Sequence, residues 1–115
     1  MSLDDSVEIR FATSDLRKLC ESGKLMTKQL GAITAKKLRN RLEDLVSASC
    51  VGELSAGRPH PLKGDREGQF ALDLYGGMRL VFVADNLPTP LHQDGSVDWR
   101  LVTRILIVYI GNYHE

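Results

Sequence analysis

The sequence predicts an α+β fold in which helices precede an antiparallel sheet and pack on one of its faces. Apolar residues recur at spacings of three, four and seven over residues 34–49, as on one face of an amphipathic helix. A Gly-Gly pair, typical of a tight hairpin, separates the strand patterns at 69–75 and 78–84. A further apolar strand at 100–110 extends these two into a meander. Helices that precede a meander pack together on one side of it, so the opposite face is left open.

Two shorter elements precede the long helix. Residues 7–11 alternate apolar and charged side chains, as a half-buried strand does. Ser14 is a candidate N-cap for a helix over residues 15–21, and Gly23 is a candidate stop signal for that helix. The predicted order is therefore strand, two helices and three strands.

Length and composition indicate a single domain that spans residues 1–115, which is close to the usual size of one domain. Cys20 and Cys50 are too few and too far apart for a disulfide scaffold or a thiolate metal site. Their simplest interpretation is reduced thiols in the cytosol. No apolar run is long enough to span a bilayer, and the acidic N-terminus does not resemble a secretory signal. We therefore expect a cytoplasmic protein without a membrane partner.

The charges balance overall but are unevenly distributed. The chain has 15 basic and 15 acidic residues. No acidic residue interrupts a basic segment formed by Lys24, Lys28, Lys36, Lys37, Arg39 and Arg41. A solvated helix face is the simpler interpretation of this segment, and a contact surface for a polyanion is the alternative.

Two internal features could carry chemistry. In the loop at 60–68, prolines flank His60 and two glycines follow Lys63, which restricts the backbone and permits sharp turns. From composition alone, a rigid charged turn is the simpler interpretation of this loop. Arg79 is a lone charge in an otherwise apolar strand, so it must reach solvent or a partner. An ion pair with Asp73 or Asp65 and a fork that binds phosphate are equally compatible with that position.

The C-terminal tail is the third candidate. Its polar residues follow directly on the last apolar strand and are Asn112, Tyr113 and His114. A frayed end is the simpler interpretation of these residues. In a simple meander, His60 and His114 lie at opposite ends of the sheet and meet only if the chain folds back. The segment at 61–68 could span about 26 Å when extended, which permits that return.

Metal chemistry is not expected, because the three histidines are isolated in the sequence and form no recognised ligand spacing. We therefore expect neither a metal nor another cofactor. Histidine together with lysine, arginine and tyrosine suits acid–base phosphoryl chemistry on RNA.

These segments together resemble HigB, the plasmid-maintenance killer toxin of the RelE/ParE superfamily. The likeness rests on the loop sequence HPLKGDREG at 60–68, the strand sequence MRLVF at 78–82 and the terminal Asn112-Tyr113-His114. It covers essentially the whole chain, because the element order also matches. It implies a RelE-like α+β fold, with an antiparallel sheet that carries two helices on one face. The family tail usually reads Asp-Tyr-His, and Asn112 stands here in place of the acid.

The resemblance implies the toxin of a type II toxin–antitoxin system. Such a toxin is a ribosome-dependent endoribonuclease that cleaves mRNA by metal-independent acid–base catalysis, and a HigA-like helix-turn-helix antitoxin silences it. The implied catalytic residues are His60, Lys63, Arg79, Tyr113 and His114. The residues expected to contact RNA or the ribosome are Lys36, Lys37, Arg41, Arg66 and Asn112. The alternatives are a non-enzymatic ParE-like toxin that binds DNA gyrase and an inert module that only engages the antitoxin.

Overall fold

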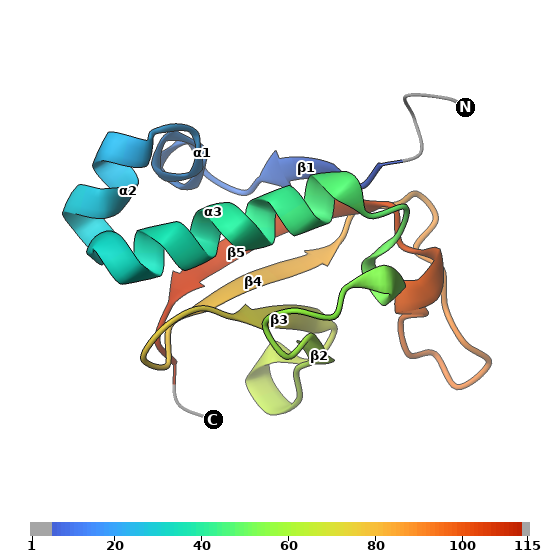
Figure 1. The fold of residues 1–115 in the computed structure, drawn as a ribbon. Coiled ribbons are helices and arrows are strands. Elements are labelled where there is room, and N and C mark those ends of the chain that lie inside the picture. The colour runs from blue at the N-terminus through green and yellow to red at the C-terminus, as the bar shows by residue number, and fades with distance from the viewer. Residues whose placement is uncertain (1–5, 114–115) are drawn as a thin grey trace.

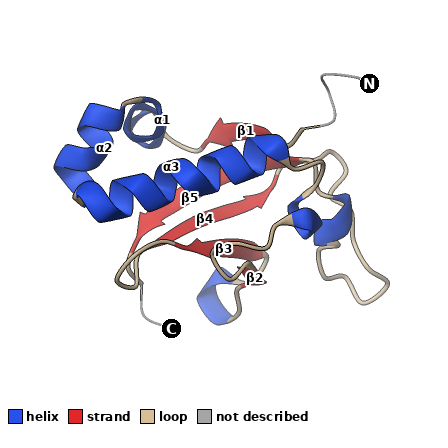
Figure 2. Ribbon diagram, viewed as in Figure 1, coloured by secondary structure: helices blue, strands red, loops and turns tan. Residues whose placement is uncertain are grey.

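Helices cover one face of a five-stranded sheet in the computed structural model, which describes residues 6–113 (Figure 1). The helices of this described part are α1 (Ser14–Glu21), α2 (Gly23–Leu30) and α3 (Ala32–Ser47). The strands are β1 (Glu8–Phe11), β2 (His60–Pro61), β3 (Gln69–Asp73), β4 (Arg79–Ala84) and β5 (Arg104–Gly111). Short 3₁₀ turns add η2 (Val51–Glu53), η3 (Gly64–Arg66) and η4 (Trp99–Leu101). Figure 2 shows α1, α2 and α3 gathered on one side of the sheet.

The sheet has the order β1-β5-β4-β3-β2. Strands β3, β4 and β5 pair antiparallel, so the predicted meander is confirmed. Strand β1 adds to the edge of β5 in parallel, with Ile9 opposite Ile105. The helices pack on one face only, as predicted. No helix between residues 6 and 113 combines the length and the apolar character needed to cross a membrane.

The number of helices predicted from the sequence was wrong, because the described chain has three rather than two. Gly23 does not end α1 but begins α2, which the Ser22 hydroxyl caps by accepting a hydrogen bond from the Leu25 amide at 3.1 Å. Gly31, at φ 84°, separates α2 from α3 and supplies a backbone conformation that other residues rarely adopt. The N-cap of α1 is Thr13 rather than Ser14, since the Thr13 hydroxyl accepts from the Leu16 amide at 3.1 Å.

The loop that contains His60 folds back against the sheet. We predicted no strand there, but His60 and Pro61 form β2 and pair antiparallel with β3. The Leu62 amide continues this pairing by donating to the Gln69 carbonyl oxygen at 2.9 Å. The intervening residues turn through η3, so the segment at 61–68 makes the return that the sequence permits. As a result, His60 lies beside the sheet and not beyond its end.

The main core lies between the helices and the sheet. Its fully buried side chains include Met26, Leu38, Leu45, Leu72, Leu80, Phe82, Ile105 and Ile107. Each such side chain contributes roughly 1.5–3 kcal/mol by leaving water. A second, smaller cluster covers part of the opposite face and contains Leu62, Ala71, Val81, Val108, Tyr109 and Tyr113. This second cluster positions the candidate site.

The loop at 86–98 is ordered by a buried carboxylate. Asp98 is only 6% exposed and accepts two hydrogen bonds from the Arg100 guanidinium at 3.0 Å each. These bonds hold the pKa of the Asp98 carboxyl below its usual value. Leu91 and Val97 form an isolated antiparallel bridge within the loop. The loop is therefore braced against η4 at the end of the sheet away from Arg79.

Candidate functional site

The face of the sheet opposite the helices, called the open face below, carries the candidate site. Residues directly opposite each other on paired strands place their side chains on the same face. One row across this face consists of His60, Ala71, Val81 and Tyr109. The next row consists of Asp73, Arg79 and Gly111. Four strands therefore bring His60, Arg79 and the C-terminal tail to one surface.

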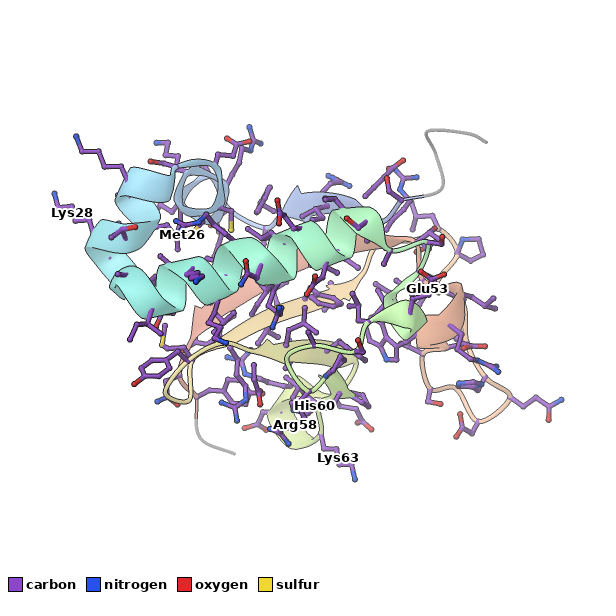
Figure 3. All side chains as sticks on the ribbon, viewed as in Figure 1. Met26, Lys28, Glu53, Arg58, His60 and Lys63 are labelled. Atoms are coloured by element: carbon purple, nitrogen blue, oxygen red, sulfur yellow. The ribbon has the colours of Figure 1, made fainter. Side chains whose placement is uncertain are left out.

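His60 is half-buried, and its ring orientation is fixed by the backbone before it. Its Nδ1 lies 2.7 Å from the Arg58 carbonyl oxygen. Since a carbonyl oxygen can only accept a hydrogen bond, Nδ1 carries the proton. The lone pair of the neutral ring is therefore on Nε2, which suits a general base. Figure 3 shows His60 and Arg58 beside each other at the edge of the sheet.

Arg79 is held by the strand opposite it. Its Nε lies 3.1 Å from Oδ1 of Asp73, its direct cross-strand partner, and its Nη1 donates to the Gly77 carbonyl oxygen at 2.6 Å. Of the ion pairs considered from the sequence, the one with Asp73 is therefore present. The same carboxylate binds the Arg58 Nε through Oδ2 at 2.8 Å. Two guanidinium groups thus share one carboxylate at the margin of the open face.

Arg66 contacts two tyrosine rings of the site at once. Its guanidinium carbon lies 4.5 Å from the Tyr109 ring centroid and 4.8 Å from that of Tyr113. Its Nη1 also donates to Gln69 Oε1 at 2.9 Å. The Arg79 guanidinium lies 5.5 Å from the Tyr113 ring, so both arginines contact the beginning of the tail.

The tail is attached to β5 through Tyr109, whose hydroxyl donates to the Asn112 carbonyl oxygen at 3.1 Å. Asn112 itself is exposed, and its side chain lies against Gly77 in the β3–β4 hairpin. Asn112 therefore helps to hold the tail against β5 and the β3–β4 hairpin. Its expected contact with RNA stays a prediction. His114 lies outside the described residues.

Other predicted site residues lie away from this cluster. Lys63 is exposed, and Figure 3 shows its side chain directed outward from the molecule. Lys36 and Lys37 are exposed on α3, on the opposite side of the sheet. Arg41 is 13% exposed and pairs with Asp44 at 2.9 Å, so its charge is largely satisfied within the chain.

Sequence reasoning missed Arg58 and Tyr109 as members of the site. The only sequence signal for Arg58 was its position just before the loop that contains His60. Tyr109 gave no signal, because it lies in an apolar strand whose residues were assigned to the core. Within residues 6–113, no three histidine, cysteine or carboxylate side chains gather closely enough to hold a metal ion.

The separation across the site fits a nucleotide. His60 and Arg79 are two strands and two residues apart, which places their Cα atoms about 12 Å from each other for ordinary strand spacings. Side chains that extend from both positions toward the space between them could contact a single nucleotide. The positive charges suit a phosphate, and the half-buried tyrosine rings suit contact with a base.

Comparison with known proteins identifies the class to which this fold belongs. No family model matches the chain. The fold is similar to a YoeB/ParE toxin from Agrobacterium tumefaciens, with a TM-score of 0.59, 14% identity, and coverage of 94% of this chain and 100% of that one. It is also similar to a YoeB–YefM complex from Staphylococcus aureus, with a TM-score of 0.56, 17% identity and coverage of 95% and 98%. The fold is therefore that of the RelE-superfamily toxins.

The sequence comparison narrows this class. Endoribonuclease HigB of Proteus vulgaris is 32% identical over 74 residues, which are 63% of this chain and 78% of that protein. The chain belongs to the HigB family, as the motifs in the sequence predicted.

Proposed function

We propose that residues 1–115 form one toxin domain of a type II toxin–antitoxin pair and that it cleaves mRNA on the ribosome without a metal. The observation that carries this proposal is the placement of His60 on the same sheet face as Arg79, Arg66 and Tyr113. This arrangement supplies a base, a phosphate clamp and a stacking surface. The relative in Proteus vulgaris is named an endoribonuclease, which supports RNA cleavage as the activity of this chain.

The substrate supplies its own nucleophile in this mechanism. His60 Nε2 removes the proton of an RNA 2′-hydroxyl, and the 2′-oxygen attacks the adjacent phosphorus. The bond to the 5′-oxygen breaks, and an acid protonates that leaving oxygen; His114 is our candidate acid. The products carry a 2′,3′-cyclic phosphate and a 5′-hydroxyl. One general base or acid contributes roughly 10²- to 10⁴-fold to the rate.

The remaining groups act on charge and orientation. Arg79 binds the scissile phosphate, and its contribution increases as negative charge develops in the transition state. Tyr113 stacks on a base or orients His114. Lys63 is a weaker candidate for the base than His60, because lysine needs burial or nearby positive charge to lose its proton, and this side chain is exposed.

The proposed partners are an antitoxin and the ribosome. A YoeB toxin of Staphylococcus aureus has been solved with its partner YefM, which supports a protein antitoxin for this chain as well. We assign that role to a HigA-like helix-turn-helix protein that covers the open face or its rim. Lys36 and Lys37, with Arg41 and the rest of the basic segment, would contact ribosomal RNA from the helix side. The open face would then be directed toward the mRNA.

Induction of the chain in cells, followed by mapping of RNA 5′ ends, tests this proposal. We expect new 5′ ends within coding sequences for the wild type and their loss by at least about 100-fold for His60→Ala. His92→Ala is the matched control and should behave as the wild type, because His92 is exposed in the loop at 86–98. Growth arrest without new 5′ ends would instead favour the gyrase-binding alternative. Unchanged cleavage by His60→Ala would refute the assigned base.

A further inference from the structure

Arg58 adopts an unusual backbone conformation at the edge of the candidate site. It is the one residue other than glycine between positions 6 and 113 with a positive φ, at 47°. Such a conformation costs energy for a residue with a side chain and is often retained at functional sites. The Gly57 carbonyl oxygen, which accepts from the Asp73 amide at 2.6 Å, fixes the chain just before Arg58. The backbone is therefore locked where it presents this arginine.

Two features connect Arg58 to the residues of the proposed reaction. Its carbonyl oxygen binds His60 Nδ1 at 2.7 Å, and its Nε shares the Asp73 carboxylate with Arg79. The side chain of Arg58 is 64% exposed, whereas those of Arg79 and Asp73 are 22% and 30% exposed. Arg58 is thus the outer member of a cluster that combines two positive charges with one negative charge.

We propose that Arg58 binds an RNA phosphate next to the scissile one and that Asp73 is the positioning residue that aligns Arg58 and Arg79 along the RNA backbone. This inference rests on the proposed function, because it assigns Arg79 to the scissile phosphate. RNA presents a regular series of phosphates, so two aligned guanidinium groups match two consecutive linkages.

A purely structural ion pair explains these observations less well. An exposed pair contributes little to stability, and it would not account for a positive φ at its arginine. The chain offers a direct comparison in Arg10 and Asp85, whose ion pair at 3.2 Å has side chains 68% and 21% exposed. Arg10 lies on the regular strand β1 at the far edge of the sheet. The Arg10–Asp85 ion pair is similar to the Arg58–Asp73 pair, but Arg10 is two strands away from β4, which carries Arg79.

The test combines protein variants with RNA that lacks one charge. The purified full chain is incubated with ribosome-bound mRNA in which one phosphate is replaced by a neutral methylphosphonate. Two such RNAs are used, one with the neutral linkage just before the cleaved bond and one with it just after. In each, the 2′-hydroxyl next to the neutral linkage is removed, and the 2′-hydroxyl at the cleaved position is kept. The control RNA lacks that hydroxyl but keeps the phosphate. We expect one of the two neutral linkages to raise KM for the wild type by about tenfold, the size of one hydrogen bond to a charged group. On the control RNA, Arg58→Ala should raise KM by a similar factor. On the RNA with that neutral linkage, the KM of Arg58→Ala should equal the KM of the wild type.

The other variants separate the roles. Arg10→Ala should respond to the neutral linkage as the wild type does. Asp73→Asn should raise KM, because Arg58 is misaligned, and should also lower kcat, because Arg79 is no longer aligned with the charge of the transition state. Arg58→Ala should raise KM alone. Equal sensitivity of the wild type and Arg58→Ala to both neutral linkages would overturn the phosphate assignment. Faster cleavage by Asp73→Asn would overturn the positioning role, because it would show that Asp73 merely neutralises Arg79. Absence of cleavage by the wild type on the control RNA would refute the proposed function itself.

Discussion

Replacement of Arg66 by alanine should lower the free energy of unfolding by about 2 kcal/mol. The guanidinium contacts the Tyr109 and Tyr113 rings at 4.5 and 4.8 Å and donates to Gln69 at 2.9 Å. Each ring contact at a partly exposed site contributes about 0.5–1 kcal/mol, and the hydrogen bond from the partly exposed guanidinium to the neutral Gln69 amide oxygen contributes about 1 kcal/mol. With a urea m-value of about 2 kcal/mol per molar, the unfolding midpoint should fall by about 1 M.

Urea denaturation of the purified chain measures this change, and two controls assign it. Arg66→Lys keeps the charge but not the planar group, so it should recover less than half of the loss. In a double-mutant cycle, Arg66→Ala and Tyr109→Leu should couple by about 0.5–1 kcal/mol. A loss below about 0.5 kcal/mol with an unchanged m-value would show that the stacked arrangement does not hold the tail.

Three further outcomes are expected. Arg79→Ala should reduce cleavage by roughly 10²-fold or more, and Arg79→Lys should restore little of it because lysine cannot form the bidentate fork; single-turnover rates measure both. Burial raises the pKa of the Cys20 thiol to about 11. Its alkylation by iodoacetamide at pH 8, followed by mass spectrometry, should therefore be on the order of 100-fold slower in the native chain than in urea. Reversal of Lys36 and Lys37 to glutamate should weaken ribosome binding and flatten its dependence on salt in sedimentation assays, whereas an unchanged dependence would remove α3 from the interface.

The elements whose apolar residues repeat at regular spacings were predictable from the sequence. The meander and the long helix were predicted because their apolar residues repeat over many positions. The last strand, however, begins at Arg104 and not at residue 100, because the preceding residues form the 3₁₀ turn η4. Helix α2 was missed because Gly23 and Gly31 bracket it, and glycine commonly marks the end of a helix. Ser22, its N-cap, was the signal that could have revealed it. Strand β2 has two residues, which is too short for an alternation of side chains to be recognised.

The site was predictable only where a motif marked it. His60, Arg79 and Tyr113 were identified through their resemblance to a known family, and the structure places them on one face. Tyr109 could not be assigned by alternation, because a bulge at Val81/Phe82 interrupts the register of β4 and β5. Ile107 therefore enters the main core while Tyr109, two residues later, lies on the open face. The pairing of Arg58 with Asp73 depends on a positive φ and on contacts across β2 and β3, which no local pattern indicates.

The chemistry of the RNA ends tests the proposed mechanism most directly. The purified chain is incubated with ribosome-bound mRNA, and the termini of both fragments are determined by mass spectrometry. A base at His60 and a nucleophile from the substrate predict a 2′,3′-cyclic phosphate on the upstream fragment and a 5′-hydroxyl on the downstream fragment. Removal of the 2′-hydroxyl at the cleaved position should abolish the reaction. Fragments with a 3′-hydroxyl and a 5′-phosphate, or cleavage that persists without that 2′-hydroxyl, would contradict the mechanism.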